Sequence, residues 1–469
     1  MRTLIRGGTV VTSAGAFGAD VLVEGETIVQ LGTRLDVAVD EVRDARGCFV
    51  LPGLVDNHTH LAMPTMGTVT CDDFDSGTAA AAAGGTTCIV DFALQTDGSL
   101  LAGLDAWKAK AAGRAHIDYG FHLVLTDVSD AALAELDQAV AAGVTTFKVF
   151  MAFKGAFMVD DEQLLRALRR TSEIGGLLLV HAENGDAIDL YVREALAAGQ
   201  TEPRHHALTR PPETEAEATS RAIRLAGWAQ CPIFIVHVTC EGAVGEVQRA
   251  RDAGHPVYGE TCVQYLLLTQ DELERPGFEG AKYVCSPPLR SRHDQDVLWA
   301  ALRQGALQGV STDHCPFHYR GQKELGRGDF SKIPNGLPTI EHRLTLLYDR
   351  GVRAGRLTLP ELVERTATAP ARIFGLAPRK GTIAPGADAD LVIFDPDLEV
   401  TISAATHRMA ADYDPFEGLV CRGAARTVLA RGEVVYDDGQ VVSHPGRGRY
   451  VPRAPFAVGG ERVAAGGVS

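Results

Sequence analysis

The chain has 469 residues and a formal net charge of −15, with 45 basic and 60 acidic side chains. Apolar residues make up 45% of the chain and charged residues 22%, which is ordinary globular usage and excludes a disordered or collagen-like protein. The acidic balance argues against a nucleic-acid partner, which would require a basic surface. The length fits one barrel of ~250 residues together with a smaller unit.

Cysteine usage and the N-terminus bear on location. The nine cysteines are scattered, and none forms a C-x-x-C pair. This spacing predicts neither a disulfide framework nor a structural zinc knot and favours a reducing compartment. Arg6 and the glycines after it interrupt any signal-peptide core, and no uncharged apolar stretch reaches the ~18 residues of a membrane helix. We therefore expect a cytoplasmic protein that does not bind a membrane.

The two ends of the chain are predicted to form one β domain. Residues 2–11 (RTLIRGGTVV) and 426–435 (RTVLARGEVV) are short β-rich runs around a glycine, which is typical of hairpin strands. Residues 385–395 read as a turn followed by a strand. The interpretation is a small β-sandwich-like domain built from residues 1–52 and 382–440. The alternative is a chance similarity between two β segments.

Between residues 53 and 381, short apolar runs alternate with longer stretches rich in Ala, Leu, Glu and Arg. The apolar runs are 51–60, 86–94, 119–126, 145–152, 177–184, 232–239, 257–262 and 309–316. The stretches between them, such as 160–175, have helical periodicity. Eight strands with helical crossovers predict an α/β fold, a (β/α)8 TIM barrel. Longer connections near 200–215 and 317–338 are expected to be loops at the barrel mouth.

Polar side chains stand at the ends of these predicted strands. They are His58, His60, Lys148, His181, His237 and Asp313. The C-terminal ends of barrel strands face the active site, and residues two apart on a strand point the same way. Imidazole and carboxylate ligands suit zinc or another first-row divalent metal. Any one histidine could equally be a hydrogen-bonded core residue, but the whole set at corresponding positions indicates a metal centre.

Lys148 lies among apolar neighbours in the run from Phe147 to Met151. Burying an ammonium is costly, so burial lowers the lysine pKa toward the neutral amine. A neutral amine can add carbon dioxide and become a carbamate, an anionic ligand with two oxygens. The alternatives are a lysine that extends to solvent and one that pairs with a carboxylate.

These residues lie within motifs that resemble the dihydropyrimidinase and D-hydantoinase family, cyclic amidohydrolases of the amidohydrolase superfamily. The similarity runs from near residue 1 to about 453. The most specific stretches are PGLVDNHTH (52–60), GGTTCIVDF (84–92), FKVFMAFK (147–154), GETCVQYLLLT (259–269), STDHCPF (311–317) and IPNGLPTIEHR (333–343). TDHCPF in particular is similar to this group rather than to dihydroorotase or allantoinase.

The resemblance implies a two-metal hydrolase. The implied ligands are His58, His60 and Asp313 on one metal, His181 and His237 on the other, and carboxylated Lys148 between them. Zinc is expected, with manganese as the alternative. Asp313 would take the proton of a metal-bridging hydroxide as it attacks and deliver it to the leaving nitrogen. The product would be an N-carbamoyl amino acid from a dihydropyrimidine or a 5-monosubstituted hydantoin.

The resemblance also implies a substrate pocket. Ser286 and Asn335 match positions that hold the cyclic amide, largely through main-chain groups. Loops 61–67 and 153–159 would shape the pocket for the exocyclic substituent. Their apolar side chains suit an uncharged group, although the methionines could equally fill the core. These side chains are Met63, Met66, Phe153, Phe157 and Met158. A preference for D substrates is usual in the family.

One position departs from the family pattern. Phe153 stands where the family usually has a tyrosine, and a phenyl ring cannot donate a hydrogen bond to the developing oxyanion. Tyr265 and Tyr319 are candidate replacement donors. The alternative function is therefore a related cyclic amide or imide hydrolase with a non-standard substrate. A further alternative is a non-catalytic binding protein like the vertebrate neuronal relatives, but these lack the metal ligands that this chain retains.

The resemblance further suggests a homotetramer or a homodimer. Residues 441–469 form a C-terminal tail rich in Gly, Pro and Arg. The segment PGRGRYVPR (445–453) is expected either to reach a neighbouring subunit or to remain mobile.

Overall fold

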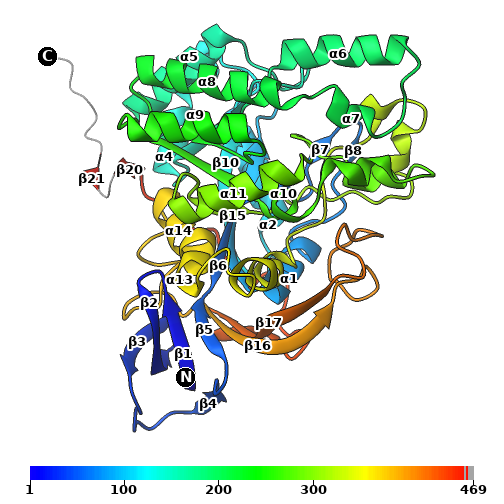
Figure 1. Cartoon of the computed structure of the whole chain (residues 1–469). Helices are drawn as coiled ribbons and strands as arrows, with labels where there is room; N and C mark the ends of the chain where they lie inside the picture. The colour runs from blue at the N-terminus through cyan, green and yellow to red at the C-terminus, as the bar shows by residue number, and fades with distance from the viewer. Residues whose placement is uncertain (459–460, 463–469) are drawn as a thin grey trace, which may run out of the picture.

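The computed structural model describes residues 1–458 and 461–462 and consists of a barrel and a second β domain (Figure 1). The barrel and its covering helices fill the upper part of the view. The β domain lies below, where strands from the N-terminus and from the C-terminal part of the chain meet.

Eight parallel strands form the barrel in the order β6-β9-β10-β11-β12-β13-β14-β15. They are β6 (Leu54–Thr59), β9 (Thr86–Leu94), β10 (Asp118–Val124), β11 (Thr146–Phe150), β12 (Leu177–His181), β13 (Ile233–Ile235), β14 (Val257–Cys262) and β15 (Gly309–Ser311). The buried Arg343 guanidinium spans the gap between β6 and β15 and donates to the carbonyls of Val55 at 3.1 Å and Val310 at 3.0 Å. All eight predicted strands and the predicted TIM barrel are confirmed.

Helices lie between the strands and cover the outside of the barrel (Figure 1). They are α1 (Ser76–Ala83), α2 (Leu100–Ala111), α3 (Asp130–Ala134), α4 (Leu136–Ala141), α5 (Asp161–Glu173), α6 (Gly185–Ala197), α7 (His205–Leu208), α8 (Pro212–Trp228), α9 (Glu241–Asp252), α10 (Val263–Leu267), α11 (Arg292–Gln304), α12 (Arg343–Leu347), α13 (Leu359–Val363) and α14 (Ala369–Ile373). Shorter helical turns are Gln270–Glu274, Glu279–Tyr283, Lys323–Gly326, Phe330–Lys332, Tyr348–Val352 and Glu364–Thr368. Helix α5 begins where the Asp160 carboxylate accepts from the Gln163 amide, a capping box that confirms the helix predicted over 160–175.

The second β domain is built from both chain ends, as predicted, and its strands form one nine-stranded sheet. Its strands are β1 (Arg2–Thr12), β2 (Gly15–Glu24), β3 (Thr27–Gly32), β4 (Glu41–Asp44), β5 (Phe49–Pro52), β16 (Leu391–Thr401), β17 (Val420–Ala430), β18 (Glu433–Asp437) and β19 (Gln440–Val441). Antiparallel pairing of β5 with β16 joins the two ends. Strand β5 ends two residues before β6, so the sheet leads directly into the barrel. Two small pairs complete the structure, β7 (Pro64–Thr65) with β8 (Thr68–Val69) and β20 (Ala457–Val458) with β21 (Glu461–Arg462).

The two glycine-containing runs of this domain differ from one another. Residues 426–435 form a true hairpin, with Gly432 in the turn between β17 and β18. In contrast, Gly7 and Gly8 are not a hairpin turn, because β1 continues through them with a shift in register after Ile5. Gly7 has a φ of +76°, and its amide donates to the side chain of Asp20 on the neighbouring strand β2, at 2.8 Å to Oδ1, instead of to a backbone carbonyl.

The C-terminal segment differs from the prediction that it reaches a neighbour or stays mobile. As far as Phe456 it packs on the barrel of its own chain. The buried Arg453 guanidinium donates to Thr146 Oγ1 at 2.7 Å and to the carbonyl of Phe121, and the Tyr450 hydroxyl donates to the carbonyl of Ala142 at 2.8 Å. Side chains in this Gly- and Pro-rich segment thus bind barrel polar groups. The part of the predicted tail at 459–460 and 463–469 lies outside the described residues.

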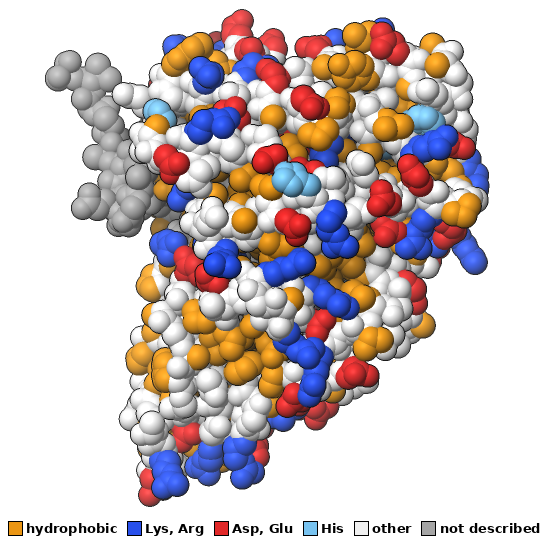
Figure 2. All heavy atoms as spheres, in the orientation of Figure 1, with side chains coloured by type: hydrophobic (Ala, Val, Ile, Leu, Met, Phe, Trp, Pro, Cys, Tyr) orange, Lys and Arg blue, Asp and Glu red, His pale blue; other side chains and the backbone are white. Residues whose placement is uncertain are grey.

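The surface is mixed in charge on the face shown in Figure 2, where acidic and basic side chains are interspersed over α8, α9 and α11. Within the described residues, no helix combines the length and the apolar character needed to cross a membrane.

Candidate active site

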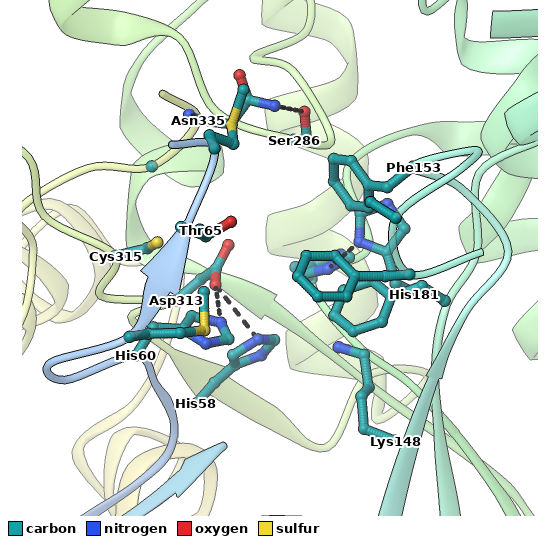
Figure 3. Close-up of a pocket in the computed structure, with 17 residues that line it drawn as sticks. His58, His60, Thr65, Lys148, Phe153, His181, Ser286, Asp313, Cys315 and Asn335 are labelled. Carbon is teal, nitrogen blue, oxygen red and sulfur yellow. Dashed lines mark hydrogen bonds and ion pairs between the residues drawn. The ribbon is translucent and has the colours of Figure 1, made fainter. Parts of the chain in front are cut away.

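A cavity of about 220 Å³ opens at the C-terminal ends of the barrel strands. The six predicted metal ligands and five of the residues predicted to contact the substrate line it. They are His58, His60, Met63, Lys148, Phe153, Phe157, His181, His237, Ser286, Asp313 and Asn335. Residues from strands β6, β7, β11 and β12 and from several connecting loops, far apart in the sequence, therefore meet in one place (Figure 3).

The first cluster in the cavity consists of His58, His60 and Asp313. His58 lies near the end of β6, His60 follows that strand, and Asp313 comes two residues after β15. The Nε2 atoms of both histidines lie 3.2 Å from the same oxygen, Asp313 Oδ1 (Figure 3). Burial opposes ionisation of Asp313, but the two histidines hold its pKa below the usual value. Two nitrogens and a carboxylate oxygen converge as the ligands of one cation do.

Glu260 orients this cluster from behind, and the sequence analysis missed it. Its Oε1 lies 2.7 Å from His58 Nδ1, and its Oε2 accepts from Asn57 Nδ2 at 2.5 Å. A carboxylate on one ring nitrogen of a histidine turns the other nitrogen toward a metal. Burial raises the pKa of Glu260 to about 7. Glu260 lies inside β14 rather than at its end, so it was not found among the polar residues at strand ends. The available signal was that Glu260 is the one charged residue of this strand.

The second cluster consists of His181, the last residue of β12, and His237, two residues after β13. His181 Nδ1 lies 2.9 Å from His237 Nε2, and His181 Nε2 lies 2.7 Å from Glu183 Oε2. Burial lowers the pKa of His237 well below its usual value, so this imidazole is neutral and keeps a lone pair. Glu183 contacts the ring of His181 as Glu260 contacts the ring of His58 in the first cluster. Glu183 was also not identified from the sequence.

Lys148 lies on β11 between the two clusters (Figure 3). Its side chain is fully buried, with Nζ 4.7 Å from the centroid of the Phe92 ring and 4.8 Å from that of Phe150. Nζ has no hydrogen-bond partner in the described part of the chain. Burial lowers its pKa to about 7. The two alternatives, a lysine that extends to solvent and one paired with a carboxylate, are therefore excluded.

The donor set fits divalent metal ions. Several buried polar atoms here lack a partner among the described residues, namely Lys148 Nζ, His60 Nδ1, His237 Nδ1 and Glu183 Oε1. Buried polar groups in proteins are normally paired, so a cluster of unpaired ones indicates a site that binds an ion or a substrate. Neutral imidazoles with a carboxylate are the ligands that zinc and related ions prefer.

A second group of side chains could also hold a metal by residue type, but its polar atoms have partners within the protein. It consists of His342, His407 and Asp414. Asp414 Oδ2 lies 2.8 Å from His342 Nε2 and 3.2 Å from His407 Nδ1, and the other ring nitrogen of His407 lies 3.0 Å from the carbonyl of Ala411. Both nitrogens of His407 therefore face acceptors. Burial by itself would lower the pKa of His407, but Asp414 raises it above the usual value. This group is a hydrogen-bonded ion pair of the fold.

The polar side of the cavity carries Ser286 and Asn335. Asn335 Nδ2 donates to Ser286 Oγ at 3.1 Å, and the backbone amide of Asn335 lies 3.3 Å from Met66 Sδ (Figure 3). Ser286 Oγ also lies 3.1 Å from Nε2 of the buried His206, a residue that the sequence analysis did not identify. Two separate loops are thus joined at the cavity wall.

Another part of the cavity wall is apolar. Phe153 adopts a left-handed backbone conformation, with a φ of +66°, and its ring centroid lies 5.0 Å from that of His181. Phe150 and Phe157 contact it, and Met63 and Met66 complete the apolar lining. Met158, which the sequence analysis included in this wall, does not line the cavity.

The candidate replacements for the missing tyrosine hydroxyl are not in the cavity. Tyr265 donates its hydroxyl to the carbonyl of Pro287 at 2.8 Å, and neither Tyr265 nor Tyr319 is among the lining residues. The hydroxyl that does face the cavity opposite Phe153 belongs to Thr65 on β7 (Figure 3). It makes no hydrogen bond to the described residues. Thr65 lies in the loop 61–67 that was predicted to shape the pocket, but it was not singled out because the sequence does not show which residues of that loop face the cavity.

Comparison with known proteins agrees with this geometry. Residues 49–435 match the model of the amidohydrolase family. The chain is 53% identical to a D-hydantoinase of Geobacillus stearothermophilus and 54% identical to one of Streptomyces coelicolor; the alignments cover 97% of this chain and 97% and 98% of those proteins. The crystal structure of dihydropyrimidinase from Brevibacillus agri is similar with a TM-score of 0.96 at 53% identity, over 97% of this chain and 100% of that one. The chain belongs to the dihydropyrimidinase and hydantoinase branch of the amidohydrolase family, hydrolases that act on cyclic amides.

Proposed function

We propose that this protein is a two-metal hydrolase that opens dihydropyrimidines and 5-monosubstituted hydantoins to N-carbamoyl amino acids. The observation that carries the proposal is the fully buried, unpartnered Lys148 between two groups of histidine side chains. Relatives of similar length named D-hydantoinase and dihydropyrimidinase support the substrate class.

Each predicted ligand has a place in this proposal. His58, His60 and Asp313 would hold one cation, and His181 and His237 the other. Lys148 would bridge them after its neutral amine adds carbon dioxide, which forms an N–C bond, releases one proton and leaves a carbamate with two oxygens. Zinc is the proposed metal and manganese the alternative, because both accept imidazole and carboxylate ligands.

The residues of the chain then control the position of the substrate and the path of the proton. When bound, the two cations supply Lewis acidity that polarises the scissile carbonyl and lowers the pKa of water. Asp313 accepts the proton of the attacking water through a carboxylate oxygen. It returns that proton to the ring nitrogen as the C–N bond breaks, so water adds across the amide without net change in charge at Asp313.

The two walls of the cavity suggest how the ring lies. Ser286 and Asn335 present polar groups to the cavity, and Phe153 and its neighbours form an apolar part of its wall (Figure 3). A ring amide can place its polar edge against the first and an uncharged exocyclic substituent against the second. We propose a preference for D substrates, which is supported by the names of relatives that are 53% and 54% identical.

Phe153 supports a second candidate, a cyclic amide or imide hydrolase with a non-standard substrate. The phenyl ring cannot donate a hydrogen bond, and the Tyr265 hydroxyl is engaged elsewhere. A substrate that needs no donor at this position would suit the cavity better than a simple hydantoin. The two candidates share the metal site and differ only in the ring that is opened.

The test is ring opening by purified protein loaded with zinc or manganese in bicarbonate. Dihydrouracil, hydantoin and a set of 5-monosubstituted hydantoins are assayed together, with the N-carbamoyl product as the readout. We expect turnover that disappears on chelation and in Lys148→Ala. A fully metal-loaded protein that opens none of these rings would contradict the first candidate and favour the second.

We further propose a cytoplasmic homotetramer, with a homodimer as the alternative. All nine cysteines are free thiols, which suits a reducing compartment. Leu208 and Trp228 are 67% and 73% exposed, and an intersubunit contact would cover such side chains. Light scattering coupled to size exclusion, together with cell fractionation, tests both statements.

A further inference from the structure

A second lysine is fully buried beside the active-site cavity. Lys323 begins the helical turn Lys323–Gly326, and its side chain has no exposed surface. Its ammonium donates to three backbone carbonyls, at 2.8 Å to Val284, 2.7 Å to Pro334 and 2.8 Å to Gly336. An ammonium has three donors, so all of them are used. No carboxylate pairs with Lys323 in the described part of the chain.

The three carbonyls belong to the two loops that form the polar wall of the cavity. Val284 lies two residues before Ser286, and Pro334 and Gly336 flank Asn335. The carbonyl of Val284 also accepts from the amide of Gly336 at 3.0 Å. On the cavity side, Asn335 Nδ2 donates to Ser286 Oγ. The two loops are therefore joined from behind by Lys323 and in front by this side-chain hydrogen bond.

The orientation of these carbonyls determines where the next amides point. A trans peptide unit is planar, and its C=O and N–H point in opposite directions. Because the carbonyl of Pro334 points at Lys323, the N–H of Asn335 points away from it. That N–H lies against Met66 Sδ, a cavity-lining atom and a weak acceptor. The amide is thus directed at the cavity side and lacks a strong acceptor of its own.

The charge on Lys323 is costly for the protein. Burial lowers its pKa to about 7, and an apolar side chain of the same size would fill the space without that cost. In return, its three donors satisfy three buried carbonyls that would otherwise lose this partner. Its distinctive effect is to fix three peptide units that belong to two different loops.

We propose that Lys323 is a positioning residue for the ring-amide substrate, which holds the Ser286 and Asn335 loops so that their main-chain groups face the ring before it binds. This inference rests on the proposed function and assigns Lys323 no contact with the substrate. Preformed hydrogen-bonding groups reduce the ordering cost of binding, so the effect belongs mainly to KM.

The test compares Lys323→Met with Lys380→Met. Lys380 is also buried, but its Nζ lies 2.7 Å from Asp118 Oδ2 and 2.9 Å from Asp390 Oδ2 at the opposite end of the barrel. In the metal-loaded protein, Lys323→Met should raise KM for ring substrates about tenfold, which corresponds to about one hydrogen bond lost to substrate, with kcat changed less than about threefold. Lys380→Met should leave both constants unchanged. Lys323→Gln, which keeps two donors, should lie between wild type and Lys323→Met.

Wild-type turnover separates failure of this inference from failure of the proposed function. If the wild type opens rings and Lys323→Met folds with an unchanged KM, the positioning role is wrong while the function stands. If neither Lys323 variant folds, hydrogen exchange of the wild type without substrate decides. The amides of Val284 and Gly336 both donate to backbone carbonyls, and exchange as slow as that of the barrel strands at these two amides supports preorganisation. Fast exchange that slows only when product binds would overturn it.

Discussion

Each end of the barrel contains a buried lysine, and the two lysines differ in their partners and in the direction of their pKa shift. At the mouth, Lys148 is fully buried with no hydrogen-bond partner among the described residues, and its pKa falls to about 7. At the floor, Lys380 is equally buried, but its Nζ lies within 2.7–3.0 Å of Asp118, Asp388 and Asp390. Burial alone would lower its pKa, but these carboxylates raise it above the usual value.

The difference separates a charge that is paired within the fold from a lysine that the proposed function uses. The floor is a complete network, because Asp118 also pairs with Arg431 at 3.1 Å and accepts from the amide of Arg449 at 3.0 Å. It thereby connects the barrel, the β domain and the C-terminal segment. At the mouth, in contrast, the polar atoms face one another across a cavity. Buried groups without partners are expected where a ligand completes the set.

Replacing each lysine by methionine gives the largest expected contrast. Lys148→Met should abolish ring opening, because the bridge between the two clusters is lost. In metal-stripped protein it should leave the free energy of unfolding unchanged or raise it, because a buried amine without a partner is removed. Urea unfolding and the N-carbamoyl product assay measure the two effects. A marked loss of stability in Lys148→Met without metal would contradict the comparison.

Lys380→Met should have the opposite profile. Removing one partner of a buried ion network costs about 3–5 kcal/mol, because carboxylates are left buried without a cation. Urea unfolding of the same metal-stripped protein measures this cost, and the folded fraction should retain the wild-type KM. An unfolding free energy within error of wild type would show that the floor network is not structural.

Phe153→Tyr tests whether the missing hydroxyl in the apolar wall of the cavity limits activity. The new hydroxyl would add a donor to the apolar wall beside His181. Because loss of one oxyanion donor costs ~10²–10³ in rate, we expect a gain of about tenfold or more in kcat/KM on hydantoins. Phe153→Leu is the control without a hydroxyl. If the tyrosine variant gains on no ring amide, Phe153 is not the cause of any weak activity and the non-standard substrate loses its support.

Thr65 is expected to have the smallest effect. Its hydroxyl faces the cavity opposite Phe153, where it can donate to a ring carbonyl. A neutral hydrogen bond is worth about 0.5–1.5 kcal/mol, so Thr65→Val should lower kcat/KM about two- to tenfold. Thr65→Ser keeps the hydroxyl and should remain close to wild type. Equal activity of the valine and serine variants would assign Thr65 to packing alone.

Sequence pattern was sufficient for the barrel and for the convergence of its polar side chains. Strand and helix periodicities are local, and the C-terminal ends of parallel barrel strands necessarily share one rim. His58, His181 and Asp313 could therefore be placed together from their positions after apolar runs. The same logic failed for Glu260, which lies within its strand rather than at the end.

Tertiary structure alone decided which buried groups have partners. The apolar residues around Lys148 in the sequence predicted its burial, whereas no such run surrounds Lys323 or Lys380. All three side chains are buried in the structure, and their Nζ atoms differ in the groups that surround them. The fate of the Gly- and Pro-rich segment 445–453 likewise depended on strand-end polar groups exposed at the barrel floor. Residue type and spacing thus determined the fold and the chemistry available to this protein. Partners distant in the sequence determined which charges are structural and which remain available to a ligand, because desolvation and pairing depend on distance in space.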